Sequence, residues 1–295
     1  MLNRTVPNRT VLKQITLSLL LFLGAWSQAK PATAQALLPY TLPLDQERLQ
    51  ADGESLASDA AQLAQFQQFD EALARAQLAA QLLPENADVL SLLGSLYLQA
   101  SEPQPAKAIS TLERANALQP DNSLIMFALG NAYFSDGSYA EAASSLEAGL
   151  KMEPDNANAL FDLGNAYYKL AQYDQAIAQY EKAISNNAEF WPAVNNIGLV
   201  MYESGNIEGA IARWREALAL AGTEETEPLL AIAVAQFSQG QQSSSDIDLA
   251  IAGLERDPRY AEIDFLQENL WGDQLITDTQ AFFAVPNLEA LLRQL

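Results

Sequence analysis

The sequence repeats one short phrase at a fixed interval. Leu-Gly-Asn-Ala-Tyr stands at residues 129–133 and again at 163–167, 34 residues later. The same interval links Gly164 to Gly198, and a related phrase, Leu-Gly-Ser-Leu-Tyr, occurs upstream at residues 93–97. A period near this length is typical of stacked helical hairpins, in which each unit buries its apolar face against its neighbours. We therefore expect an all-α solenoid.

Each unit has the spacing of two amphipathic helices. In the central unit, the first helix carries Met126, Leu129, Gly130 and Tyr133. Their i, i+3, i+4, i+7 order places them on one helix face. Pro120 and Pro154 should end the second helices, because helices rarely run past the residue before a proline. Asp121-Asn122 and Asp155-Asn156 then offer caps for the helices that follow.

We expect glycine at one position of each first helix to let the second helix cross closely. The glycines are Gly130, Gly164 and Gly198, and the small residues expected to face them are Ala142, Ala176 and Ala210. Small residues on both sides would allow the two backbones of a hairpin to approach each other.

These units resemble the tetratricopeptide repeat (TPR) family. The unit from Ser123 matches the family's small and large hydrophobic positions with Met126, Leu129, Gly130, Tyr133, Ala142, Leu146, Gly149 and Pro154. The units starting at residues 157 and 191 match in the same way. The resemblance implies an α-solenoid of TPR hairpins, whose first helices line a concave groove that binds polypeptides.

The repeat frame predicts the domain organisation. Residues 53–224 should hold five repeats, with the units from Gly53 and Ala87 less regular than the other three. Residues 225–258 are expected to form a degenerate sixth hairpin. Residues 37–52 contain Pro39 and Pro43 and no helical period, so we expect a linker there.

The tail, residues 259–295, should form a C-terminal helical cap. It is rich in leucine and phenylalanine, so it must bury itself, most simply over the open end of the array. The stretch from Phe265 to Gly272 resembles the tails of cyanobacterial TPR proteins that are exported or associated with thylakoids. Some of these help to assemble photosynthetic membranes or pigment enzymes.

Residues 1–36 have the order of a secretory signal peptide. Arg4, Arg9 and Lys13 precede an apolar run of 12 residues from Ile15 to Trp26, and small residues follow at Ala32, Ala34 and Ala36. The run is shorter than the roughly 20 residues of a spanning helix. We predict export to the periplasm or the thylakoid lumen, with an uncleaved membrane anchor as the alternative.

The composition excludes several classes of protein. With no cysteine and no histidine, the chain has no disulfide, no thiolate or imidazole metal ligand and no Ser-His-Asp triad. Beyond residue 36, 12 basic residues stand against 37 acidic ones. Such a surface repels nucleic acid. We expect no enzyme, no cofactor and no metal site, and a membrane contact only through an uncleaved N-terminus.

The resemblance to the TPR family places a set of aromatic and polar residues in the groove. The candidates are Phe127, Asn131, Phe134, Phe161, Asn165, Tyr168, Lys169, Asn195 and Tyr202. Asparagine amides can donate to and accept from a peptide backbone, and aromatic rings add apolar contact area. In a second interpretation, Asn165 serves local geometry, while Phe127 and Phe161 pack on the next helix. Lys169 is nearly the only cation of the set, which argues against a clamp for a C-terminal carboxylate pair.

These features favour a scaffold or assembly factor that holds an extended or helical segment of a partner protein. The excess of acidic residues favours a basic partner. Two alternatives remain open. The first is an architectural protein that self-associates through its apolar end, and the second is a carbohydrate-binding module.

Overall fold

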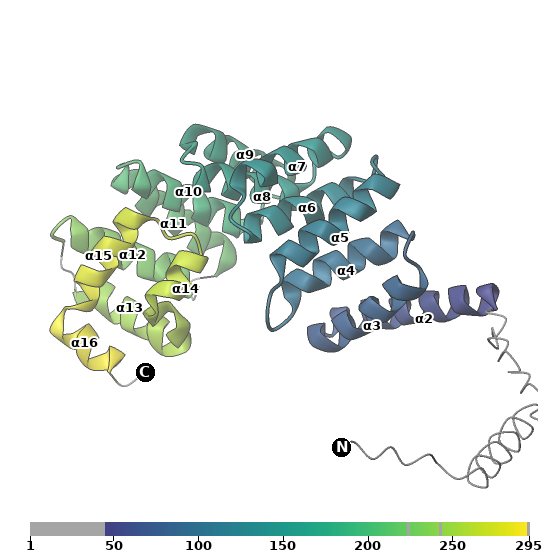
Figure 1. Ribbon diagram of the computed structural model, residues 1–295. Helices are drawn as coiled ribbons and strands as arrows, with labels where there is room; N and C mark the ends of the chain where they lie inside the picture. Colours follow the sequence, from purple (N-terminus) through teal and green to yellow (C-terminus); the bar gives the residue numbers. More distant parts are fainter. Residues whose placement is uncertain (1–44, 223–224, 242–243, 294–295) are drawn as a thin grey trace, which may run out of the picture. The chain divides into compact units, whose positions relative to one another are not determined.

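The computed structural model describes residues 45–222, 225–241 and 244–293 (Figure 1). Its helices are α2 (Gln46–Gln65), α3 (Phe69–Leu82), α4 (Ala87–Gln99), α5 (Pro105–Leu118), α6 (Ser123–Ser135), α7 (Tyr139–Met152), α8 (Ala157–Lys169), α9 (Tyr173–Asn186), α10 (Trp191–Glu203), α11 (Ile207–Ala221), α12 (Thr226–Ser238), α13 (Ser244–Arg256), the 3-10 turn η1 (Pro258–Ala261), α14 (Ile263–Glu268), α15 (Asp273–Phe283) and α16 (Pro286–Leu292).

The helices pair into successive hairpins, which confirms the predicted all-α solenoid. Helices α4 and α5, α6 and α7, α8 and α9, α10 and α11, and α12 and α13 form the pairs, and each pair also contacts the next. The predicted caps form at Asn122 and Asn156, whose side-chain oxygens accept from Leu124 N and Ala159 N. Asn86 caps α4 in the same way.

The first helix begins earlier than the sequence predicts. We expected a linker through residue 52, but α2 starts at Gln46. Its first turns are mostly polar, with Leu49 as their one large apolar residue, so they carry no apolar period. They are supported by (i, i+4) contacts, a hydrogen bond from Gln50 to Glu54 and an ion pair of Arg48 with Asp52.

The glycines of the first helices make room for large side chains, which corrects the expectation that they face alanines. A Cβ atom on Gly164 would lie 2.5 Å from Cε1 of Tyr180, and one on Gly130 would lie 2.5 Å from Cγ of Leu146. In the hairpin of α10 and α11, the Trp214 side chain covers Gly198 in the same way. Each glycine therefore accepts the bulky residue that the second helix sends across the hairpin.

The C-terminal segment, residues 258–293, covers more than the end of the array. Helix α16 contacts α13, the last second helix, as an end cap would. Helix α15, however, lies on the first helices α10 and α12, as the yellow ribbon beside the green helices shows (Figure 1). The expectation of a cap over the open end alone was wrong, because α15 runs along the face predicted to form the groove.

The predicted signal peptide and residues 37–44 of the predicted linker lie outside the described residues. Among the helices that are described, none combines the length and apolarity that crossing a membrane requires.

Candidate functional site

The nine candidate groove residues differ widely in exposure. Asn131 and Lys169 are exposed, and Phe134, Phe161 and Asn165 are partly buried. The other four are buried, although residues that line an open groove would be accessible: Phe127, Tyr168, Asn195 and Tyr202. Contact of any of the nine with a ligand stays a prediction.

The phenylalanines of the set pack within the array, as the second interpretation proposed. The Phe127 ring lies over Gly149 of α7, where any Cβ atom would collide with it. Phe161 lies between Tyr180 and Phe190, with ring centroids 5.7 and 5.2 Å away. These rings therefore stabilise the hairpins, and Phe161 also keeps part of its surface accessible.

Asn165 is the centre of a hydrogen-bond network that joins two repeats. Its Oδ1 accepts from the hydroxyl of Tyr180 at 2.7 Å and from Nδ2 of Asn196 at 3.0 Å. Asn195 Nδ2 donates in turn to Asn196 Oδ1 at 3.3 Å. The Asn165 oxygen is thus committed to the fold, which leaves only part of the amide to a ligand.

Asn131 has a simpler environment. It is exposed on α6 and hydrogen-bonds the carboxyl group of Asp162 on α8. Burial raises the pKa of Asp162 to about 6, and the Asn131 hydrogen bond opposes that shift. This pair places polar groups from two adjacent first helices next to each other.

Tyr202 is occupied by the C-terminal segment. Its hydroxyl donates to Asp278 of α15 at 2.7 Å and lies 3.0 Å from the hydroxyl of Ser238 on α12. Over α10, the predicted groove position is therefore filled by the chain itself.

A second anchor of the segment is Glu203, at the end of α10. Its carboxylate accepts from the backbone N–H of Gln274 and of Leu275, 3.2 and 3.0 Å away. These are orphan donors at the N-terminus of α15, where a negative charge is favourable. A Cβ atom on Gly272 would collide with the Glu203 side chain, so this contact requires glycine at the turn.

A third anchor joins Glu227 of α12 to Trp271. The indole Nε1 donates to Glu227 Oε1 at 3.2 Å, and Asn195 and Tyr260 also hydrogen-bond this carboxyl group. Burial raises the pKa of Glu227 to about 7, although these three hydrogen bonds oppose the shift. Glu227 was not among the predicted site residues, although an acidic residue in the mostly apolar α12 is a usable signal.

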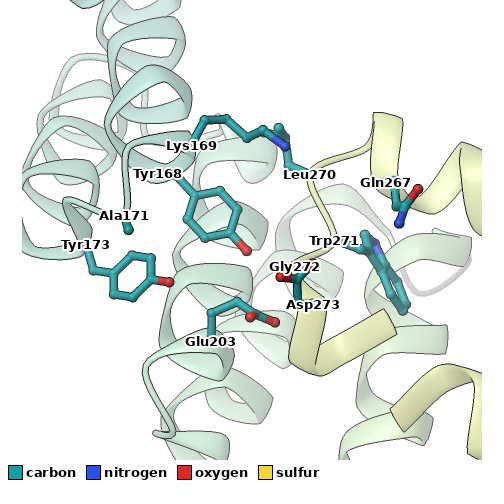
Figure 2. Close-up of a pocket in the computed structure, with 10 residues that line it drawn as sticks. All are labelled: Tyr168, Lys169, Ala171, Tyr173, Glu203, Gln267, Leu270, Trp271, Gly272 and Asp273. Atoms are coloured by element: carbon teal, nitrogen blue, oxygen red, sulfur yellow. The ribbon is translucent and has the colours of Figure 1, made fainter. Parts of the chain in front are cut away.

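Where the segment meets α8 and α10, the structure holds a pocket of about 370 Å³, which we call the Tyr168 pocket. It is lined by α8, the turn after it, Glu203 and parts of residues 267–273. Figure 2 shows Tyr168, Tyr173 and Glu203 on one side of this space and Trp271 and Asp273 on the other. Two predicted groove residues, Tyr168 and Lys169, therefore meet a wall that the sequence did not predict.

The Tyr168 hydroxyl is unusual within this pocket. The Tyr168 side chain is only 7% exposed, and among the described residues its hydroxyl has no hydrogen-bond partner. Burial strongly raises the pKa of this hydroxyl, and the nearby Glu203 carboxylate adds to that effect. Tyr168 therefore stays neutral and can both donate and accept a hydrogen bond.

In the described part of the chain, no group of three or more acidic side chains is arranged to hold a metal ion. The site instead offers hydroxyls, amides, carboxylates and aromatic faces. This set of groups suits recognition of a polypeptide.

The repeats match a known family model. The tetratricopeptide repeat model matches the chain three times, over the overlapping residues 103–157, 127–193 and 161–225. No curated protein sequence matches the chain.

Solved structures share the fold. PilF from Pseudomonas aeruginosa has a TM-score of 0.56 at 16% identity, with 80% of this chain and 99% of that chain covered. MamA from Desulfovibrio magneticus RS-1, from residue 41 to its end, has a TM-score of 0.52 at 17% identity, with 59% of this chain and 97% of that chain covered. YrrB, a TPR protein with an unusual peptide-binding site, has a TM-score of 0.51 at 19% identity, with 63% of this chain and 94% of that chain covered. Residues 103–225 therefore match the tetratricopeptide repeat family model, and the solved structures, at 16–19% identity, show that the chain shares their fold.

Proposed function

We propose that this protein is a non-enzymatic scaffold that binds a polypeptide segment of a partner protein along the first helices of its repeats. The carrying observation is that these helices already hold one polypeptide helix. Helix α15 of the same chain lies on α10 and α12 and is fixed there by Glu203 and Tyr202.

The corresponding surface upstream is accessible. On α6, Leu124 is 64% exposed and Asn131 is exposed, and on α8 Asn158 and Lys169 are exposed. An exposed leucine beside amides offers both apolar contact and backbone hydrogen bonds, which are the two needs of a peptide site. We assign the partner to α6 and α8 because α15 occupies the equivalent face over α10 and α12.

The partner should be basic. The chain carries a formal net charge of −21 at pH 7. Complementary charge raises the rate of encounter and disfavours acidic competitors. The peptide binding of YrrB is a property of that protein, and likeness at 19% identity shows the fold alone. The proposal therefore rests on the surface of this chain.

The test is site-specific photo-crosslinking of the mature chain in an extract of its native host. A photoreactive residue at position 131 or 158 should crosslink the same partner. The matched control is position 144, where Ser144 is equally exposed but lies on the second helix α7. If position 144 crosslinks the same proteins with equal yield, or no position gives a discrete product, binding along α6 and α8 is wrong and the architectural alternative gains support.

We also propose that the protein works outside the cytoplasm, in the periplasm or the thylakoid lumen. The basis is the basic, apolar and small-residue order of residues 1–36. N-terminal sequencing of soluble and membrane fractions tests it, with cleavage expected near Ala34 or Ala36. A chain that still begins at Met1 and sediments with membranes would establish the anchor instead.

A further inference from the structure

We propose that the Tyr168 pocket binds a positively charged side chain, arginine or lysine, of the partner polypeptide. The inference rests on the proposed function and names the chemistry that this function would recognise. The pocket is continuous with the α8 surface through Lys169, which lines it and is exposed.

The first argument is the Tyr168 hydroxyl. The other buried tyrosines have hydrogen-bond partners: Tyr167 donates to Glu147, Tyr180 to Asn165 and Tyr202 to Asp278. A buried hydroxyl without a partner is unfavourable, and such groups are rare in folded proteins. The hydroxyl is buried in the pocket wall. A guanidinium or ammonium N–H that displaces the side chains around it can donate to its oxygen, which stays neutral and keeps its lone pairs.

The second argument is charge. Glu203 and Asp273 line the pocket, and Lys169 is the only cation in its lining. The Lys169 ammonium lies 5.7 Å from the ring centroid of Tyr139, a contact with the preceding hairpin. The lining is thus left with an excess of negative charge. The Glu203 carboxylate already accepts two backbone N–H groups, and each of its oxygens has a second lone pair for a ligand.

The third argument is the aromatic wall. The rings of Tyr168 and Tyr173 have centroids 6.0 Å apart and are tilted by 44°. Cations bind over such rings within about 6 Å of the centroid. A pocket of about 370 Å³ has room for a long basic side chain. Hydroxyl, carboxylates and rings together fit a guanidinium or ammonium group and do not fit an anion.

The experiment uses residues 37–295, the chain without the predicted signal peptide, and three small compounds. They are the Nα-acetyl methylamides of arginine, lysine and citrulline, which replaces the guanidinium with a neutral urea of the same shape. Binding is followed by the NMR signal of the Trp271 indole N–H, assigned with a Trp271→Phe variant. We expect the arginine compound, the lysine compound or both to shift the signal saturably, and the citrulline compound to bind at least about tenfold more weakly.

Variants then test the assigned groups. Tyr168→Phe should weaken binding of the cationic compounds about fivefold, which corresponds to one lost hydrogen bond. It should not lower the melting temperature, because the hydroxyl has no partner among the described residues. Asp273→Asn should weaken binding by a similar factor. Tyr167→Phe is the matched control, because its hydroxyl bonds Glu147 outside the pocket, and it should bind as the wild type does.

The proposal is overturned if the citrulline compound binds as well as the arginine compound, if Tyr168→Phe binds like the wild type, or if no cationic compound shifts the signal. Crosslinking at positions 131 and 158 separates the two ideas. Crosslinks there with a failed pocket assay refute the pocket alone. Loss of both refutes the proposed function as well.

Discussion

The indole nitrogen of Trp271 donates a hydrogen bond to Glu227, with 3.2 Å between Nε1 and Oε1. This bond ties the C-terminal segment to a first helix through a carboxyl group whose pKa burial raises to about 7. Asn195, Trp271 and Tyr260 hydrogen-bond the group, while Glu225 is a like charge that raises the pKa further. Burial of this carboxyl group in the folded protein is therefore coupled to a proton.

The coupling predicts the direction of the pH dependence. The folded-state pKa of Glu227, about 7, lies above its ordinary value of 4.5. The folded protein thus holds a proton that the unfolded chain releases, so this group lowers the free energy of unfolding as the pH rises from about 4.5 to about 7. We expect the free energy of unfolding, measured with urea at several pH values in this range, to fall less steeply with pH for Glu227→Gln than for the wild type. Identical slopes would mean that Glu227 titrates normally in the folded protein.

The two asparagines of the repeated phrase should respond differently to substitution. We predict that Asn165→Ala lowers stability by about 1–3 kcal/mol, because it removes the partner of the buried Tyr180 hydroxyl. Asn131→Ala, at the equivalent exposed position, should cost less, since it loses only its bond to Asp162. Thermal melts of both variants make the comparison. Equal losses would contradict a structural role specific to Asn165.

Gly164→Ala should destabilise the array by about 1–3 kcal/mol through overpacking. The new Cβ atom would lie 2.5 Å from the Tyr180 ring, which is itself fully buried and has no space to retreat. Ser144→Ala, at an exposed position of α7, serves as control and should change stability by less than about 0.5 kcal/mol. Chemical denaturation decides. A Gly164 variant as stable as the control would show that the ring can move aside.

Deleting residues 259–295 should expose apolar surface and promote association. In the full chain, Leu275, Ile276 and Phe282 of α15 are buried on the side of α10 and α12. We expect more binding of a hydrophobic dye and larger particles by light scattering. Deletion of residues 37–44, which precede α2, should change neither. Equal behaviour of the two truncations would remove the covering role of α15.

The repeat architecture could be predicted because it depends on local sequence. Each hairpin contacts mainly its neighbours, so the apolar period and the capping asparagines Asn122 and Asn156 specify it. The polar first turns of α2 have no such period and were missed. The glycine positions were predicted, but not the large side chains over them, because spacing indicates that two helices are close and not which residue crosses.

The candidate site was predicted less well, for a physical reason. The apolar tail indicates that it must be buried, but its composition does not say against what. Glu203 lies one 34-residue period after the candidate Lys169, and its carboxylate accepts hydrogen bonds from the N-terminus of α15. Tyr202 likewise contacts Asp278 instead of a partner. The two members of each pair lie more than 70 residues apart in the sequence. The 34-residue period of the repeats therefore cannot predict these contacts.

The bond between Tyr202 and Asp278 spans 76 residues of sequence in a fold whose other contacts are mostly short in range. Such a bond closes a long loop, and closure can occur only after both α10 and α12 have formed. As the chain is synthesised, α15 emerges after α10 and α12, so the face that it covers stays open until α15 has been made. The late closure should make the C-terminal hairpins fold and unfold as one cooperative block. The hairpins before them keep the independent, neighbour-by-neighbour behaviour of a linear array.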